Sequence, residues 1–327
     1  MNKTEIIVHY LISKIENGIF TEGMKIPSEY ELAKQFGINK ITANKAVSQL
    51  VARGMLERRR GQAGTLVCHP KVPFGKRIVY RMALLSGYTY SSKLLRGAMI
   101  AARRRGYSLV YSEIITQENS EQWRECVELG AAGVLGTCCD LAPDGYELPV
   151  MYVGNCPNGE NLNYCACDNY TGAKQLAEFL LQRDYKKPVI LSPTVTLRHL
   201  MARYQAYLEV FPELEKRTIH INPTDFNPEN IYQELTHNYP DATALICDSD
   251  ATAFKMIHCL ENKNIHVPEN ILVTGFGYMQ EYQELRSITT VDQCPEEVGF
   301  CAAMLLIDLI EKVQPPVQRF IPPRLVP

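Results

Sequence analysis

The stretch PSEYELAKQFGINKITANKAVSQLV, residues 27–51, decides the fold of the N-terminal part of the chain. Ser28 can cap a helix and Glu31 can bond back to it, which makes a capping box, and this helix ends near Gly37. Asn39 is a suitable N-cap for a second helix with an apolar inner face. The residues of that face are Ala43, Ala46, Val47, Leu50 and Val51. The stretch therefore predicts two helices joined by a short turn.

The segments on either side complete a small domain. Apolar residues recur with helical period from Thr4 to Asn17, which predicts a first helix that stops at Gly18. After Gly54, two short strand-like segments flank residues 61–64, Gly-Gln-Ala-Gly, and predict a β-hairpin. Three helices followed by a hairpin make a winged helix-turn-helix, which is a DNA-binding unit.

The charge of the chain is divided unequally along its length. Residues 1–76 hold 12 Lys and Arg against 6 Asp and Glu, whereas the remaining residues hold 22 basic and 30 acidic side chains. A basic head on an acidic body is expected of a nucleic-acid-binding module attached to a different kind of domain. Chance clustering of solvated charges is the alternative interpretation.

After residue 68 the pattern changes. Residues 69–76, with Pro70, Pro73 and Gly75, are predicted to form a linker. Short apolar runs typical of strands then alternate with amphipathic stretches typical of helices. The predicted strands are Ile78–Leu85, Ser108–Ile114, Gly133–Thr137, Pro149–Val153, Val189–Leu191, Thr218–Ile221, Ala244–Cys247 and Ile271–Thr274. The predicted helices between them include Ser92–Arg105, Gly172–Arg183, Arg198–Phe211 and Asp250–Asn262.

Repeated strand–helix units of this kind build parallel sheets with helices on both faces. About 250 residues are enough for two such lobes. The predicted fold class is therefore α/β. A winged helix-turn-helix occupies residues 1–68, and a two-lobed parallel-sheet sensor occupies residues 77–327.

Two resemblances make this interpretation specific. The N-terminal part resembles the GntR-type DNA-binding domain. This resemblance is carried, in order, by residues 27–33, Thr42 with Ala46, residues 54–58 and the Gly64-Thr65 wing. The sensor is similar to the LacI/GalR-type sensor, itself similar to periplasmic sugar-binding proteins. This second resemblance is carried by residues 95–98, 105–107, 168–173, 203 with 207, 247–250, 267–271 with 275–276, and 289–293. The resemblances imply a homodimer, joined through the sensor, that binds operator DNA and a small ligand.

Several other classes of protein are disfavoured by the sequence. Glu5, His9 and Lys14 interrupt any signal-peptide core, and no run of about 18 apolar residues occurs, so we expect a cytoplasmic protein that does not span a membrane. The sequence lacks the C-x-x-C spacing of a structural zinc site, a Gly-rich phosphate loop and a nucleophile elbow. No metal, cofactor or catalytic residue is therefore predicted. An α/β enzyme and a transport-type solute receptor remain as alternatives. The basic winged helix argues against both.

The residues predicted to contact DNA lie on the third helix, at the start of the second helix and in the wing. Asn44 can bridge adenine N6 and N7 in the major groove, while lysines, threonine and the N–H groups at Ser28 suit phosphates. A solvated helix face is the alternative. GntR-type domains commonly carry arginines where Lys40 and Asn44 stand, so the operator is expected to differ from the usual one. The predicted set is Ser28, Lys40, Thr42, Asn44, Lys45, Arg58, Arg60 and Gly64.

The residues predicted to contact the ligand come from distant points of the sensor. The resemblance places Arg203 where the family holds its ligand and Gln293 at a crossover between lobes. Open α/β sheets bind ligands where strands end, which is where the remaining candidates lie. Asp250 fits an N-cap equally well. The predicted set is Tyr88, Tyr90, Asn155, Arg203, Ser249, Asp250 and Gln293, with the two tyrosines as a stacking wall on the loop after the first strand.

The ligand class follows only in part. The family commonly has acidic residues at the positions of Gly154 and Gly277, so recognition of hydroxyl groups must be redistributed here, or the ligand is not a typical sugar. We expect a ligand-responsive, sequence-specific transcription regulator that represses carbohydrate-metabolism genes. Its effector is a sugar or sugar derivative, with a nucleobase as the alternative.

Overall fold

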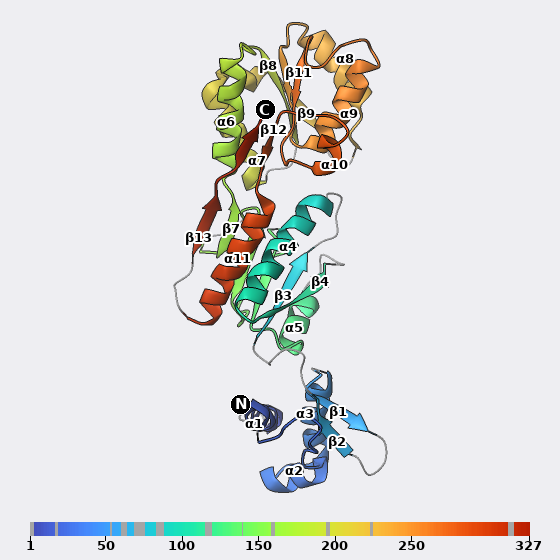
Figure 1. The fold of residues 1–327 in the computed structure, drawn as a ribbon, viewed down its shortest axis with the longest axis vertical. Helices are drawn as coiled ribbons and strands as arrows, with labels where there is room; N and C mark the ends of the chain where they lie inside the picture. The colour runs from blue at the N-terminus through green and yellow to red at the C-terminus, as the bar shows by residue number, and fades with distance from the viewer. Residues whose placement is uncertain are drawn as a thin grey trace.

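The computed structural model describes residues 3–16, 19–52, 54–59, 64–68, 76–82, 88–114, 120–138, 140–157, 161–193, 197–222, 225–312 and 317–327. These residues form an N-terminal helical domain with a hairpin, followed by two α/β lobes (Figure 1). Within the described residues, no helix combines the length and the hydropathy that crossing a bilayer requires.

The N-terminal domain has the predicted winged helix-turn-helix arrangement. Its elements are α1 (Lys3–Glu16), α2 (Glu29–Phe36), α3 (Lys40–Ala52), β1 (Leu56–Arg59) and β2 (Gly64–Val67). The two strands are antiparallel, with Leu56 opposite Val67. One apolar cluster joins all three helices through fully buried side chains such as Ile7, Leu32 and Leu50. Burial of each such side chain stabilises the fold by about 1.5–3 kcal/mol.

Local capping explains why α2 lies where the sequence predicts it. The Ser28 hydroxyl accepts from the Glu31 N–H, and the Glu31 carboxylate accepts from the Ser28 N–H at 2.8 Å, which confirms the capping box. These hydrogen bonds lower the pKa of Glu31. Gly37 ends the helix in the left-handed conformation, with φ of 60°. The Asn39 side chain accepts from the Thr42 N–H at 2.8 Å, as an N-cap of α3 does.

Lobe 1 contains a six-stranded, fully parallel sheet in the order β13-β7-β6-β5-β3-β4. One face is covered by α4 and α11, and the other is covered by α5 through Trp123. The strands are β3 (Arg77–Met82), β4 (Ser108–Glu113), β5 (Gly133–Gly136), β6 (Val150–Gly154), β7 (Tyr164–Cys167) and β13 (Gln318–Ile321). The helices are α4 (Tyr88–Arg104), α5 (Ser120–Glu128) and α11 (Pro295–Ile310).

Lobe 2 contains a four-stranded parallel sheet in the order β11-β10-β8-β9. Two helices pack on each face, α6 with α7 and α8 with α9. The strands are β8 (Pro188–Pro193), β9 (Thr218–Ile221), β10 (Ala244–Ile246) and β11 (Leu272–Thr274). The helices are α6 (Asn169–Gln182), α7 (Arg198–Val210), α8 (Pro228–Asn238), α9 (Asp250–Glu261) and the short α10 (Gln280–Gln283).

The chain crosses between the lobes at three places. It leaves lobe 1 after β7, returns after β12 (Thr290–Asp292), and passes once more between β13 and β14 (Arg324–Val326). Strands β12 and β14 pair with each other in antiparallel fashion. The two-lobed parallel-sheet architecture is therefore confirmed.

Two glycines allow α4 and α11 to touch backbone to backbone. A Cβ atom at Gly97 would lie 2.0 Å from the Glu296 carbonyl oxygen, and one at Gly299 would lie 2.0 Å from the Leu94 carbonyl oxygen. Ordinary van der Waals contact begins near 3.4 Å. The helix pair that covers the lobe 1 sheet therefore depends on glycine at both positions.

One predicted placement is wrong. The sequence interpretation put Tyr88 and Tyr90 in a loop after the first sensor strand, with the helix starting at Ser92. The structure starts α4 at Tyr88, so both tyrosines belong to its first turn. The side chain of Tyr88 lies outside the described residues. The linker residues 69–75 also lie outside them.

Candidate DNA-binding surface and effector site

Helix α3 has one face in the core and one in solvent. Ala43, Ala46, Val47 and Leu50 are fully buried. The predicted DNA-contacting residues Lys40, Asn44 and Lys45 are exposed, so the structure brings these three together on the outer surface of α3.

A chain of hydrogen bonds holds the outer surface of α3 in place. The Arg58 guanidinium donates to Glu29 at 3.2 Å and to the Ser48 hydroxyl at 3.1 Å. Ser48 donates in turn to the Asn44 side-chain oxygen at 3.3 Å. Arg58 was predicted to contact DNA from the wing. Its bonds link the wing to α2 and α3, and they fix the amide of Asn44.

Two predicted phosphate contacts have other partners in the structure. The hydroxyl of Thr42 donates to Asn39 at 2.8 Å, and both the N–H and the hydroxyl of Ser28 donate to Glu31. A phosphate at either residue would have to displace a cap. The contacts of Thr42 and Ser28 with DNA stay predictions, and each would require the loss of a capping hydrogen bond.

Gly64, the first residue of the second wing strand, has a backbone conformation that favours glycine. Gly64 has φ of 74°, and a Cβ atom there would lie 2.5 Å from the Lys25 side chain. Arg60 and the hairpin tip at residues 61–63 lie outside the described residues.

In the sensor, the centre of the candidate effector site is Arg203 on α7. The side chain is buried, with 7% of its surface exposed. Its guanidinium donates to the Asn169 side-chain oxygen at 2.8 Å and to the Asp248 carbonyl oxygen at 3.0 Å, and it stacks on the Phe276 ring at 3.5 Å from the ring centre. These partners all belong to lobe 2, and burial lowers the pKa of Arg203. The arrangement fixes the orientation of a rigid hydrogen-bond donor.

Tyr90 brings lobe 1 to the same site. Its hydroxyl donates to the Gly154 carbonyl at 3.3 Å, and burial raises its pKa while the charge of Arg203 opposes part of that rise. The charge of Arg203 in lobe 2 therefore acts on Tyr90 in lobe 1. The side-chain oxygen of Asn155, the residue after Gly154, is buried and has no hydrogen-bond partner within the described residues.

Ser249 and Asp250 have structural roles that the sequence could not separate. Ser249, not Asp250, is the N-cap of α9, with its hydroxyl accepting from the Thr252 N–H at 3.2 Å. Asp250 is fully buried and accepts from the Met279 N–H at 2.7 Å and from the Thr290 hydroxyl at 2.5 Å. Burial raises its pKa. Both residues lie at the end of β10, but their polar atoms are already bonded within lobe 2.

Neutral side chains lie next to Gly154 and Gly277, the two positions where the family commonly has an acidic residue. A Cβ atom at Gly154 would lie 3.3 Å from the Tyr90 hydroxyl, and one at Gly277 would lie 3.8 Å from the Gln293 amide oxygen. Both glycines have positive φ, of 98° and 136°. Tyr90 and Gln293 thus occupy space next to the positions where the family places carboxylates.

Three residues of the site were missed by the sequence reasoning. Asn169, Asp248 and Phe276 each contact Arg203. All three stand inside the segments that carried the family resemblance, so the signal was present, but neighbouring residues were chosen from each segment. The Asp248 Oδ1 atom is also buried without a hydrogen-bond partner in the described part of the chain.

His199, one turn before Arg203 on α7, makes stability depend on pH. Burial, together with the charge of Arg203, lowers its pKa to about 3 from 6.5. Between these values the unfolded chain binds a proton that the folded chain does not, so stability falls as pH drops below about 6.5. His199→Gln should remove this pH-dependent loss of stability. The difference between the unfolding free energies at pH 7 and pH 5 should become about 1–2 kcal/mol smaller than in the wild type. Urea unfolding at both pH values measures it, and the same narrowing in His220→Gln, an exposed histidine, would contradict the assignment.

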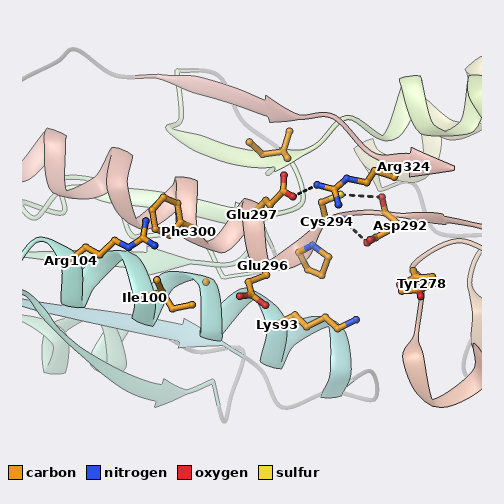
Figure 2. A pocket seen from close by; sticks show the side chains of 13 residues that line it. Lys93, Ile100, Arg104, Tyr278, Asp292, Cys294, Glu296, Glu297, Phe300 and Arg324 are labelled. Atoms are coloured by element: carbon orange, nitrogen blue, oxygen red, sulfur yellow. Dashed lines mark hydrogen bonds and ion pairs between the residues drawn. The ribbon is translucent and has the colours of Figure 1, made fainter. Parts of the chain in front are cut away.

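A separate groove of about 690 Å³ lies between α4, α11 and the crossover strands (Figure 2). At one end Lys93 lies over the Tyr278 ring, and at the other Arg104 lies over the Phe300 ring. Arg324 pairs with Glu297 in its wall. Among the predicted ligand-contacting residues whose side chains the structure describes, none lines this groove. A cavity of about 30 Å³ adjoins Arg203 in lobe 2, which is room for one or two water molecules but not for a sugar.

Comparisons with known proteins match the two parts of the chain separately. Residues 3–67 match the bacterial regulatory proteins of the gntR family, and residues 177–327 match the periplasmic binding protein-like domain. The arabinose metabolism transcriptional repressor of Halalkalibacterium halodurans is 26% identical over 95% of this chain and 90% of its own length. The ribose operon repressor of Bacillus subtilis is 24% identical over 67% of this chain and 70% of its own length.

Among solved structures, the transcriptional regulator CelR in complex with cellobiose aligns over 92% of this chain and 98% of its own, with a TM-score of 0.66 and 18% identity. This likeness concerns the fold. The relatives are repressors, which confirms the prediction of a regulator over that of an enzyme. The chain is a transcription regulator that joins a gntR-family DNA-binding domain to a periplasmic binding protein-like domain.

Proposed function

We propose that the chain is a dimeric repressor of carbohydrate-metabolism genes whose operator affinity changes when a sugar or sugar derivative binds between the lobes. The observation that carries the proposal is the buried Arg203, whose guanidinium is oriented by three residues of lobe 2 and whose charge acts on Tyr90 of lobe 1. The relatives that are named for arabinose and ribose support a pentose or a related sugar as the first candidate.

Polar groups of the two lobes match the chemistry of a polyol. The guanidinium offers donors to hydroxyl oxygens, while the unpartnered oxygens of Asn155 and Asp248 offer acceptors to hydroxyl protons. A buried acceptor without a partner costs about 1–3 kcal/mol, so a ligand that bonds to these atoms recovers that free energy. Because Asn155 belongs to lobe 1 and Asp248 to lobe 2, such a ligand favours the closed arrangement of the lobes.

A thermal-shift screen with arabinose, ribose, cellobiose, sugar phosphates and nucleobases, followed by gel-shift titration on the chain's own upstream DNA, tests the proposal. The effector should raise the melting temperature and change the Kd for the operator at least tenfold, which corresponds to about 1.4 kcal/mol of coupling. A sugar that stabilises the protein and leaves the Kd unchanged would contradict the regulatory role. Stabilisation by nucleobases alone would overturn the sugar assignment.

DNA recognition is proposed to divide between a base reader and a phosphate contact. Asn44→Ala should weaken binding to the cognate operator by about 1–3 kcal/mol and binding to random DNA very little, because its amide bonds to a base edge. Lys45→Ala should weaken both alike and reduce the salt dependence of the Kd, because it neutralises a phosphate. Fluorescence anisotropy at two salt concentrations separates them. Identical behaviour of the two variants would contradict the division of roles.

A further inference from the structure

An isoleucine projects into solvent from the outer surface of α3. Ile41, the second residue of the helix, is 80% exposed, which is more than any other large apolar side chain among the described residues. The winged helix-turn-helix core is already closed behind it by Ala43, Val47 and Leu50, all fully buried. The exposure of Ile41 therefore does nothing for the stability of the domain.

The position of Ile41 on the helix associates it with the candidate base reader. Ile41, Asn44, Lys45 and Ser48 follow the spacing i, i+3, i+4, i+7, so they share one face of α3. On that face the Asn44 amide is already oriented by Ser48, which is itself bonded to Arg58. Ile41 is thus an apolar side chain one turn from an oriented amide, at the end of a recognition helix that contacts base edges.

Apolar partners for such a side chain are scarce in the major groove. Among the base edges there, the C5-methyl group of thymine is the apolar one. One helical turn of three residues spans about 4.5 Å along α3, slightly more than the spacing of about 3.4 Å between base pairs. If Asn44 bonds to an adenine, Ile41 reaches the neighbouring base pair.

We propose that Ile41 is a specificity-determining residue that recognises a thymine methyl group next to the base that Asn44 contacts. The proposal rests on the proposed sequence-specific DNA binding. It adds a reader that contributes preference for A·T pairs through burial of apolar surface, in a domain whose helix lacks the arginines that would read guanine at these positions.

Thymine-to-uracil replacement tests this directly, because uracil lacks only the methyl group. An operator obtained by selection from random DNA is synthesised with each thymine replaced in turn, and Kd values are measured for the full-length protein, Ile41→Ala and Lys40→Ala. One replacement in each half-site should weaken wild-type binding about fourfold, the effect of uncovering one buried methyl group. Because the dimer carries two copies of Ile41, Ile41→Ala should weaken binding to the thymine operator about sixteenfold, the fourfold effect of one methyl group in each of two half-sites, and should be insensitive to that replacement. Lys40→Ala should bind more weakly to both DNAs and keep the uracil penalty.

The outcomes separate this inference from the proposed function. Specific binding with no uracil penalty at any position, or with a penalty of equal size in Ile41→Ala, overturns the role of Ile41 and leaves sequence-specific recognition intact. Failure of the selection to enrich any sequence would instead overturn the proposed function. Circular dichroism confirms that each variant is folded.

Discussion

Gly299→Ala is expected to destabilise the sensor by about 3 kcal/mol or more, and Gly97→Ala by a similar amount. The new Cβ atom would lie 2.0 Å from a backbone carbonyl of the facing helix, so no side-chain rotation can relieve the clash. The two helices would have to separate and uncover the apolar cluster beneath them, and overpacking of this kind costs about 1–3 kcal/mol, sometimes more. In a domain of this size the melting temperature should fall by about 6–12 °C.

The matched control for this experiment is Met99→Ala on α4. Met99 lies two residues from Gly97 in the sequence but is 38% exposed. Its truncation should change the unfolding free energy by no more than about 0.5 kcal/mol. If Gly299→Ala has the same melting temperature as the wild type, α4 and α11 do not pack as closely as described.

Arg203→Ala should weaken effector binding about 100-fold or more and remove the effect of the ligand on DNA affinity. The guanidinium is buried, and hydrogen bonds to a charged group are worth about 1.5–3 kcal/mol each. Operator binding without effector should persist, because α3 and the wing lie in a different domain. Isothermal titration with the effector found in the screen, together with gel-shift titration, measures both properties.

Two further variants sharpen the result for Arg203. Arg203→Lys keeps the charge and loses the planar fork, so an intermediate affinity is expected if geometry matters as well as charge. Arg183→Ala removes an exposed guanidinium from the same lobe and should bind normally. Unaltered effector binding by Arg203→Ala would remove the central residue of the proposed site.

The N-terminal domain could be predicted almost to the residue because its signals are local. The capping box at Ser28, the left-handed Gly37 and the Asn39 cap each act within one helical turn. Strand β9, Thr218–Ile221, contains β-branched apolar residues and was predicted with its exact bounds, while most other predicted strands differ from the structure by one or two residues at an end. Strand β7, with the sequence Tyr-Cys-Ala-Cys, lacks such a run and was not predicted.

Contacts between distant segments explain the rest of what was missed. Strands β12, β13 and β14 are short and are paired by partners elsewhere in the chain, so no local pattern marks them. The crossing of Gly97 with Gly299 joins residues about 200 positions apart and leaves no trace in either helix alone. At the effector site the correct segments were identified. Which residue of a segment faces Arg203 depends on the strand ending, so Ser249 and Asp250 were chosen over Asp248.

The path of the chain through the lobes determines the order in which a ribosome can complete them. The four strands of the lobe 2 sheet and the helices that pack on it come from one uninterrupted segment, residues 169–274. Lobe 1 begins earlier, at β3, but its sheet lacks an edge strand and its main covering helix until α11 and β13 have been synthesised. During translation the apolar face of β3, β5 and β6 therefore lacks the cover of α11 until more than 150 residues beyond the end of β6 have been synthesised. The lobe that starts first is finished last, and in that interval it is the part of the chain most exposed to aggregation and to chaperones.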